Sequence, residues 1–440
     1  MFKNEVAEFI YKRTYSRWME EEGRREEWPE TIERFITFLN SKRGDNIPEK
    51  TIRKIRKYMT EFSVMPSMRF LWSAGPAAEK DNTVIYNCSF AKLNCVEAFA
   101  ECLQILMCGT GFGFSVEKEE TDKLPSIPEI KSGKDIPRVI IEDSREGWAD
   151  SVKILMNSLY DGQNVYFDYS QLRQEGARLG TMGGRSSGPQ PLIKLHDFLR
   201  ETMHNAQGRK LTTLECHDIA NQIAEIVVAG GVRRSSQISL SDLDDEDMRH
   251  AKEWPFPIKR AMANNSAIYR DKPSAADFLV EWGVLAKSGS GERGIFNLLS
   301  AQNKAPSRRY APLIQGTNPC GEIMLRDMEF CNLSEVVVRE DDDLDTLLDK
   351  VETATWLGVL QSTFTDFPYL RKEWGKNCGV ERLLGVSLTG QMDNPSLMNS
   401  EVLKALKSRV IRISRKASSS LGVNMPVATT CVKPSGTVSQ

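Results

Sequence analysis

From about residue 79 onward, short apolar runs alternate with longer stretches that have helical spacing, and this alternation restricts the possible folds more than any other feature. The short runs lie at residues 84–86, 112–116, 164–167, 237–240, 267–269 and 294–297. Helices are expected between them, including 95–107 and 216–228, both apolar on one side. Alternation of this kind favours a parallel α/β sheet. Periodicity alone does not separate a closed barrel from an open doubly wound sheet.

The first 78 residues have a different pattern and are predicted to be mainly helical. Apolar residues recur near helical spacing at 6–10, 32–39 and 52–59, and charged residues fill the other faces. Two polar stretches are predicted to be loops. Residues 117–143 combine charge with several prolines and are expected to be exposed, and residues 176–191 are rich in glycine and serine and are expected to be mobile.

Size and composition exclude several classes of protein. A chain of 440 residues with 40% hydrophobic content can bury one large core or two smaller ones. A net charge of -2 gives no electrostatic reason to expect a nucleic-acid or membrane partner. The N-terminus lacks an apolar signal core and no run of about 18 apolar residues occurs, so a cytoplasmic protein is expected. Nine cysteines without short, even spacing do not resemble a secreted disulfide framework, and no metal site is expected from the scattered histidines.

Residues 318–323, Asn-Pro-Cys-Gly-Glu-Ile, concentrate reactive side chains. The proline before the cysteine and the glycine after it argue against a helix or a central strand and predict a shaped loop. Cys320 offers a one-electron donor or nucleophile, Glu322 a proton acceptor and Asn318 an orienting amide. A second cysteine, Cys331, follows in Phe-Cys-Asn-Leu-Ser-Glu. On spacing alone, a polar loop with an incidental cysteine is an equal alternative.

These two motifs resemble the finger loop and redox strand of ribonucleotide reductases, and among them the adenosylcobalamin-dependent (class II) branch. Other stretches that match the family follow in order along the chain: Tyr-Lys-Arg-Thr-Tyr-Ser-Arg-Trp (11–18), Pro-Ser-Met-Arg-Phe-Leu-Trp (66–72), Asn-Cys-Ser-Phe (87–90), Gly-Thr-Gly-Phe-Gly-Phe-Ser (109–115), Ser-Gly-Pro (187–189), Gly-Val-Arg-Arg-Ser (231–235), Ala-Asn-Asn-Ser (263–266) and Lys-Pro-Ser-Gly-Thr-Val (433–438). The Tyr-Lys-Arg-Thr-Tyr opening is similar to monomeric ribonucleoside-triphosphate reductases in particular.

The resemblance implies an α/β fold of the ribonucleotide reductase type. This is a ten-stranded barrel built from two five-stranded halves, with the finger loop (residues 318–323) through its centre. It implies an N-terminal helical region over 1–78, a first half-barrel with the effector-site region over 79–310, and the finger loop with the start of the second half-barrel over 311–440.

The resemblance also implies catalytic roles. Cys320 matches the cysteine whose thiyl radical abstracts the 3′ hydrogen of the ribose. Glu322 would take the 3′-hydroxyl proton and Asn318 would bind the ribose, although an exposed loop carboxylate and a simple turn residue are the plain alternatives. Cys88 and Cys331 match the reducing pair that ends as a disulfide, which requires adjacent strands. The other cysteines match no such role and are expected in or near the core.

Binding residues are implied as well. The phosphate-binding loop matches Pro434, Ser435, Gly436, Thr437 and Val438, and Ser67 and Asn87 match substrate contacts. The effector site matches Asp168, Arg173 and Arg178, for which a solvated charged face is the alternative. The monomeric enzymes complete this site with an inserted segment, for which residues 117–143 are short.

The resemblance implies that the chain reduces ribonucleotides to 2′-deoxyribonucleotides with adenosylcobalamin. Triphosphates are the expected substrates, because the Tyr-Lys-Arg-Thr-Tyr opening is similar to that of ribonucleoside-triphosphate reductases. The implied partners are a ribonucleoside triphosphate substrate, a deoxynucleotide effector and a thioredoxin-like reductant. Because the chain ends at Gln440, shortly after the phosphate loop, a second chain is expected to complete the barrel. The alternatives are a non-catalytic nucleotide-binding fragment and a class I large subunit that uses a partner protein's radical.

Overall fold

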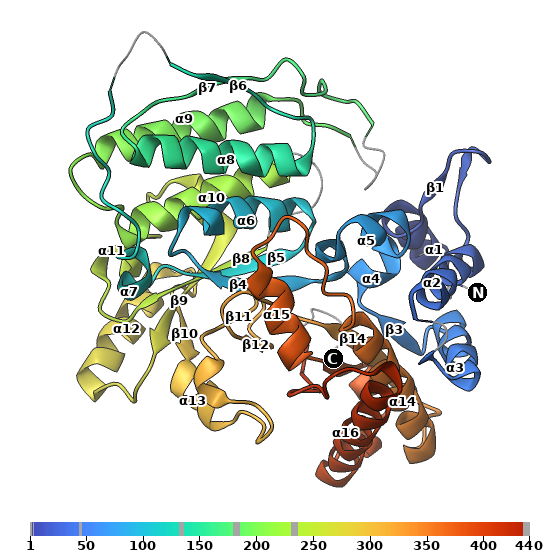
Figure 1. Cartoon of the computed structure of the whole chain (residues 1–440). Coiled ribbons are helices and arrows are strands. Elements are labelled where there is room, and N and C mark those ends of the chain that lie inside the picture. Colours follow the sequence, from blue (N-terminus) through green and yellow to red (C-terminus); the bar gives the residue numbers. More distant parts are fainter. Residues whose placement is uncertain are drawn as a thin grey trace.

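The computed structural model describes residues 2, 4–43, 46–131, 136–178, 185–229 and 236–433. A six-stranded sheet lies at the centre, in the strand order β10-β9-β8-β5-β4-β13 (Figure 1). Its strands are β4 (Cys88–Lys92), β5 (Gly111–Ser115), β8 (Gln237–Asp242), β9 (Ala263–Tyr269), β10 (Gly294–Asn297) and β13 (Glu329–Phe330). The first five run parallel to their neighbours, and β13 is antiparallel to β4. The alternation of strands and helices therefore correctly predicted a parallel sheet.

Two layers of helices cover one face of this sheet (Figure 1). The helices are α6 (Val96–Met107), α8 (Arg145–Tyr160), α9 (Gln190–Asn205) and α10 (Thr213–Ala229). Helices α6 and α10 contact the strands, and α8 and α9 lie outside them. Because α6 has the sheet on one side and α8 on the other, every residue of α6 except Glu97 is buried. A small parallel pair, β6 (Arg138–Ile140) and β7 (Tyr166–Asp168), lies near α8 and α9.

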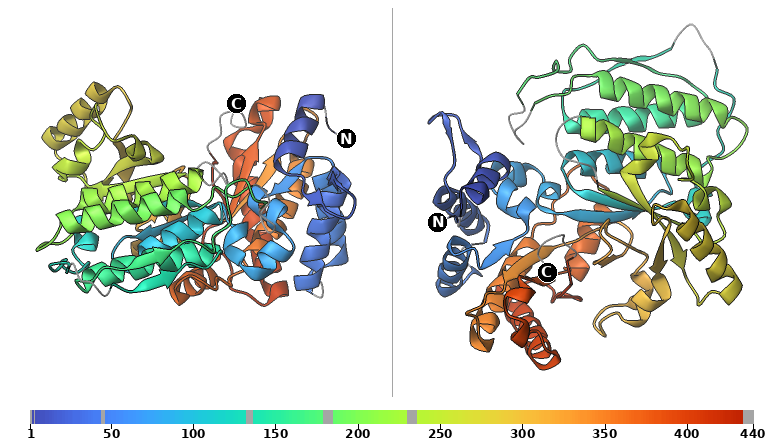
Figure 2. Two further views of the ribbon diagram at one scale, coloured as in Figure 1. Left: turned by 90° about the horizontal axis from the view of Figure 1, so that it is seen from above. Right: turned by 180° about the vertical axis from the view of Figure 1, so that it is seen from behind.

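A second sheet carries the later part of the chain, in the order β15-β14-β3. Strand β14 (Leu333–Val337) is parallel to β15 (Gly385–Thr389) and antiparallel to β3 (Val64–Pro66). A parallel bridge between Val386 and Thr430 adds the last described segment beside β15. Helices α14 (Leu344–Gln361) and α16 (Ser400–Leu421) pack together at this sheet, opposite the end that carries α8 and α9 (Figure 2).

The N-terminal region is mainly helical, as predicted, with one short hairpin. Its elements are α1 (Glu5–Thr14), β1 (Trp18–Met19), β2 (Arg24–Arg25), α2 (Trp28–Arg43), α3 (Glu49–Thr60), α4 (Met68–Ser73) and α5 (Pro76–Lys80). The predicted apolar faces of α2 and α3 are buried. The face predicted for α1 is not, because Val6 and Phe9 are 66% and 62% exposed and Tyr11 carries the packing of this helix instead.

Two further expectations from the sequence are corrected. Residues 84–86 do not form a strand: a 3-10 turn, η2 (Asn82–Ile85), precedes β4, and the Asp81 carboxylate accepts a hydrogen bond of 2.8 Å from the Thr83 amide. Residues 117–143 are not an exposed loop throughout. They begin with α7 (Lys118–Thr121), and Leu124 and Ile127 are buried. In both places tertiary packing overrides the local pattern.

The remaining elements are short helices and turns around the two sheets: α11 (Glu246–Arg249), η3 (Ile258–Met262), α12 (Ala275–Ser288), α13 (Leu298–Asn303), η4 (Ala311–Leu313), α15 (Lys372–Glu381), η5 (Gln391–Asp393) and η6 (Pro395–Leu397). Within the described ranges, the structure contains no helix with the length and apolarity needed to cross a membrane.

Candidate active site

The finger loop is the tip of a β-hairpin. Strands β11 (Gly316–Thr317) and β12 (Met324–Leu325) are antiparallel, and residues 318–323 join them. The Asn318 side chain closes the loop by accepting a hydrogen bond of 3.0 Å from the Ile323 amide. The Gly321 amide donates to the Asn318 carbonyl over 2.9 Å, and Gly321 has a φ of +82°, which glycine adopts without strain. The prediction of a shaped loop is confirmed.

Glycines allow this hairpin to lie directly against the central sheet. A Cβ atom at Gly113 of β5 would lie 2.3 Å from the Thr317 carbonyl oxygen, and one at Gly316 would lie 2.2 Å from the Phe90 ring. A Cβ atom at Gly111 would lie 3.2 Å from both the Cys88 sulfur and the Pro319 ring. The loop therefore approaches the start of β4, where Cys88 lies.

We expect Gly113→Ala to lower the free energy of unfolding by about 1–3 kcal/mol, because the added methyl group would force the hairpin away from β5. Denaturant unfolding of the purified chain measures this. Gly283→Ala in α12 is the matched control, because no atom of the described residues outside its own turn of helix lies within 4 Å of a Cβ atom at that position. Its free energy of unfolding should rise by about 0.5–1 kcal/mol. Equal effects of the two substitutions would contradict the close approach.

Strand register brings the predicted reducing pair together. Phe330 of β13 lies opposite Ser89 of β4, so Cys331 follows opposite Cys88, and the Cys331 amide donates to the Cys88 carbonyl over 2.8 Å. Neither cysteine forms a disulfide, and the two side chains interact with each other. Burial, and then the neighbouring Cys88 thiol, raise the pKa of Cys331 well above its ordinary value. The adjacency that a disulfide between them requires is present.

Cys320 differs from the other cysteines in its exposure. All nine lie within the described residues, and Cys320 alone is classed as exposed. The surrounding protein still removes water from its sulfur, and this partial burial raises its pKa, as do Cys88 and Glu322 nearby. Lys433 acts in the opposite direction. The net upward shift keeps Cys320 a protonated thiol at neutral pH.

Glu322 is a buried carboxylate with a partner for each oxygen. Its side chain is 2% exposed, so it is not the exposed loop carboxylate of the alternative interpretation. The Asn318 amide donates to Oε2 over 2.8 Å, and the Lys433 ammonium lies 2.9 Å from Oε1. Asn318 is itself fully buried and is hydrogen-bonded at both ends of its amide.

Three more polar residues lie near this group, and sequence reasoning did not assign them to the site. Burial raises the pKa of Glu335 on β14 to about 7, while its hydrogen bond to Ser387 on β15 lowers it. Cys431 is half-buried, and burial followed by the charges of Glu322 and Glu335 raises its pKa. Two signals were available: Glu335 is a carboxylate in the mostly apolar strand β14, and Lys433 opens the family-matched stretch 433–438.

Two of the predicted substrate-binding residues, Ser67 and Asn87, lie within the described part of the chain. Ser67 caps α4, where its hydroxyl accepts from the Phe70 amide over 3.2 Å and donates to the Ile85 carbonyl over 3.3 Å. Asn87 immediately precedes Cys88, and its side-chain oxygen is buried without a hydrogen-bond partner among the described residues. The phosphate-loop residues Pro434, Ser435, Gly436, Thr437 and Val438 lie outside the described residues.

The predicted effector residues form three separate ion pairs. Asp168 pairs with Arg138 at 3.0 Å. Arg173 pairs with Asp143 at 2.7 Å, and Arg178 pairs with Glu20 of the N-terminal hairpin at 3.2 Å. The structure therefore does not bring the two arginines to one shared partner.

A buried ion cluster connects the base of the finger hairpin to β13. Arg309 donates to the Met324 carbonyl of β12 over 2.7 Å and lies 3.2 Å from Glu329 of β13 and 2.6 Å from Glu381 of α15. All three charged side chains are at most 4% exposed. Burial and the neighbouring Glu381 raise the pKa of Glu329 well above its ordinary value.

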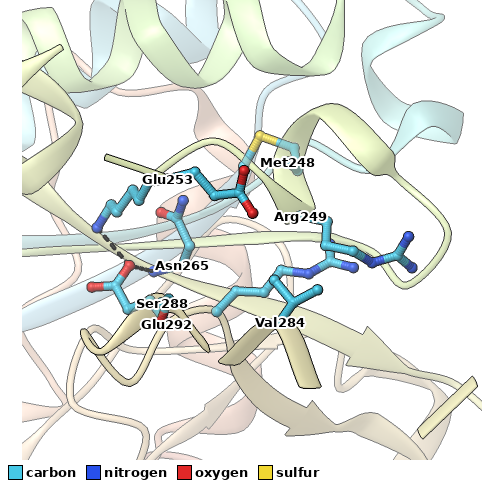
Figure 3. A pocket seen from close by; sticks show the side chains of 9 residues that line it. Met248, Arg249, Glu253, Asn265, Val284, Ser288 and Glu292 are labelled. Carbon is cyan, nitrogen blue, oxygen red and sulfur yellow. Dashed lines mark hydrogen bonds and ion pairs between the residues drawn. The ribbon is translucent and has the colours of Figure 1, made fainter. Parts of the chain in front are cut away.

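A small polar pocket lies apart from this site, between α11 and α12 (Figure 3). Three cations line it, and each is ion-paired: Lys252 with Glu292 at 2.6 Å, Arg293 with Glu281 at 2.7 Å, and Arg249 with both Glu281 and Glu246. These cations are therefore neutralised by the protein itself and offer no unpaired charge to a ligand.

Two family models match parts of the chain. The ribonucleotide reductase alpha domain matches residues 1–76, and the insertion domain of B12-dependent ribonucleotide reductase matches residues 120–203. The second match corrects the expectation from the sequence that the insert is confined to the short segment 117–143. It extends through β6, α8 and β7 and includes most of α9.

Whole-chain comparisons agree with these matches. Adenosylcobalamin-dependent ribonucleoside-triphosphate reductases from Levilactobacillus brevis and Lactobacillus acidophilus are 27% and 28% identical, over 99% of this chain and 71% and 72% of theirs. A crystal structure of a B12-dependent (class II) ribonucleotide reductase matches with a TM-score of 0.81 and 25% identity, over 97% of this chain and 72% of that chain.

A class Id alpha subunit from Actinobacillus ureae shares the fold, with a TM-score of 0.61 at 13% identity over 98% of this chain and 72% of that chain. The five parallel strands β4, β5, β8, β9 and β10, with the finger hairpin against them, belong to the part of the chain that shares this fold. The chain is thus a homologue of the adenosylcobalamin-dependent (class II) ribonucleotide reductases and has their α/β-barrel type of fold.

Proposed function

We propose that this chain reduces ribonucleoside triphosphates to 2′-deoxyribonucleotides, with adenosylcobalamin as cofactor and Cys320 as the residue that becomes a radical. The observation that carries the proposal is the pairing of β13 with β4. It sets the thiols of Cys88 and Cys331 together at the foot of a loop that presents an exposed thiol, Cys320, and a buried carboxylate, Glu322.

The open face of the finger loop fits a bulky cofactor. Cys320 is exposed, and among the described residues no atom beyond the chain neighbours lies within 4 Å of a Cβ atom built at Gly321. These two residues would face adenosylcobalamin. When bound, the cofactor supplies the radical that takes the hydrogen atom from a thiol. That transfer requires the S–H form of Cys320, which its raised pKa maintains at neutral pH.

Each of the three loop residues has a separate role in the reaction of the ribose. The Cys320 thiyl takes the 3′ hydrogen atom and returns it at the end, so that the S–H bond is restored. Glu322 accepts the proton of the 3′-hydroxyl group, and Asn318 holds both Glu322 and the sugar. These steps need groups held within about 3 Å of the ribose, which one hairpin closed by its own hydrogen bonds can provide.

The two electrons come from Cys88 and Cys331. The 2′-hydroxyl group leaves as water after gaining a proton, and the paired thiols lose two electrons and two protons as they form a disulfide. The net reaction converts a ribonucleotide and a dithiol into a deoxyribonucleotide, water and a disulfide. A thioredoxin-like dithiol then reduces the disulfide by thiol–disulfide exchange and prepares the chain for another turnover.

Other residues are assigned to the binding of substrate and effector. Residues 434–438 would hold the substrate phosphates through backbone amides and hydroxyl groups. Asn87, whose buried side-chain oxygen has no hydrogen-bond partner among the described residues, and Ser67 would contact the substrate. Asp168, Arg173 and Arg178 would bind a deoxynucleotide effector after exchanging their present ion pairs for the ligand.

We expect pre-reduced chain without external reductant to form at most about one deoxynucleotide per chain, because the reducing pair supplies only two electrons. Product is measured by chromatography, and a Cys88–Cys331 disulfide by peptide mass spectrometry. Cys331→Ser should form neither. Cys95→Ser is the control, since Cys95 lies beside Arg371 and away from the loop, and it should behave as the unchanged chain. Product without this disulfide would contradict the assignment of the pair.

A further inference from the structure

We infer that Lys433 is a further active-site residue, which orients the Glu322 carboxylate and contacts the Cys320 sulfur. The inference rests on the proposed function and extends it to a residue outside the finger loop. The Lys433 ammonium lies 2.9 Å from Glu322 Oε1, and it is near enough to the Cys320 sulfur to lower the pKa of that thiol. It therefore links the group that would give up a hydrogen atom to the group that would accept a proton.

The backbone before Lys433 is fixed by the second sheet. The Val386 amide of β15 donates to the Thr429 carbonyl over 3.1 Å, and the Cys431 amide donates to the Val386 carbonyl over 3.2 Å. The Lys433 amide itself donates to the Ser387 hydroxyl over 3.3 Å. Its side chain is only 23% exposed. The ammonium therefore reaches the loop from an anchored strand and not from a free surface position.

Charge balance explains why a lysine belongs here. The groups that interact with Lys433 are Glu322, Cys320, Cys331, Glu335 and Cys431, which include two carboxylates and three thiols. A carboxylate buried as deeply as Glu322 is costly without a charged partner. Among the described residues, Lys433 is the cation that forms an ion pair with it.

The two oxygens of Glu322 also show how Lys433 would position it. Asn318 holds Oε2 from within the loop, and Lys433 holds Oε1 from the opposite sheet. With both contacts present the carboxylate plane is fixed relative to the Cys320 sulfur. Without Lys433 only the bond to Asn318 would remain, and the carboxylate could turn about it. Loss of Lys433 should therefore impair the chemical step more than the binding of substrate.

The first test measures the Cys320 thiol directly and needs no cofactor or turnover. Purified chain is alkylated with iodoacetamide at a series of pH values, and modification of Cys320 is followed by peptide mass spectrometry. The positive charge of Lys433 lowers the pKa of Cys320, and Glu322 raises it. Lys433→Met should therefore slow alkylation at pH 8 by about tenfold, which corresponds to one pKa unit, and Glu322→Gln should accelerate it.

Matched variants keep this test decisive. Lys433→Arg retains the charge and should restore most of the rate, and the circular dichroism of each variant checks its folding. The double variant Lys433→Met/Glu322→Gln should show a non-additive effect, because the two side chains are in contact. An alkylation rate in Lys433→Met equal to that of the unchanged chain would overturn the inference.

The second test separates positioning from substrate binding. In the anaerobic reduction assay, Lys433→Met should lower kcat by about a hundredfold while KM stays within a few-fold. A large rise in KM with kcat retained would make Lys433 a phosphate-binding residue and overturn the inference. If the unchanged chain showed no reduction at all, the proposed function would fail. The alkylation result would still decide the contacts of Lys433.

Discussion

Cys320→Ser should reduce deoxynucleotide formation by about 10⁴-fold or more, because the residue that starts the chemistry has no substitute. A serine hydroxyl has nearly the same size, but its O–H bond is too strong to give up its hydrogen atom. The measurement is an anaerobic assay with purified chain, adenosylcobalamin, a ribonucleoside triphosphate and dithiothreitol. Because Cys320 is exposed at a loop tip, the free energy of unfolding should change by less than about 0.5 kcal/mol.

Cys95→Ser provides the control for a cysteine outside the site and should retain full activity. The Cys320→Ser variant should also keep its affinity for the substrate, measured by equilibrium binding, since the phosphate and ribose contacts remain. If Cys320→Ser formed deoxynucleotide at the unchanged rate, the radical would have to reside elsewhere, and the assignment of the finger loop would be wrong.

Arg309→Met should lower the free energy of unfolding by about 3–5 kcal/mol, the largest stability effect that we expect in this molecule. It removes the cation from a cluster in which Glu329 and Glu381 are almost completely buried, and it also removes the hydrogen bond to the Met324 carbonyl. Denaturant unfolding measures the loss. As a control, Arg178→Met removes an exposed ion pair with Glu20 and should change the stability by less than about 1 kcal/mol.

The same cluster predicts a pH dependence of stability. The folded state raises the pKa of Glu329 above its ordinary value of 4.5, so the folded state binds this proton more tightly than the unfolded chain does. The resulting stabilisation is complete below about pH 4.5 and is lost as the pH rises towards the raised pKa. Glu329→Gln mimics the protonated form and should flatten this decline. An identical decline in the variant would assign the pH dependence to other groups.

The sequence predicted the strands of the central sheet better than the segments that lead into it. The runs at 112–116, 237–240, 267–269 and 294–297 all fall within or largely overlap strands. The run at 84–86 is equally apolar, yet it packs into the core as η2, and the Asp81 side chain caps this turn. Helix α1 shows another limit of prediction from sequence. Helical spacing identifies an apolar face but does not reveal whether another element covers it.

Some residues of the candidate active site can likewise be recognised from the sequence, and others cannot. The finger loop is contiguous, so its residues can be recognised together from the sequence. The proximity of Cys88 and Cys331 depends on the register of β13 against β4, which the family resemblance implied and no local pattern indicates. Lys433 meets the loop, and Glu335 interacts with Lys433 and Ser387, through the register of the second sheet, with partners far away in the sequence. Contacts of this kind become visible only in the folded chain.

The raised pKa of Cys320 also affects how fast oxidants react with its thiol. Peroxides attack thiolates, and they oxidise a protonated thiol much more slowly. An exposed sulfur at the tip of a loop would otherwise be the first group to be converted to a sulfenic acid. Because burial, Cys88 and Glu322 keep the proton on this sulfur, the loop discriminates between two kinds of reagent. It remains open to a radical that takes a hydrogen atom and resists electrophiles that require a lone pair on a thiolate.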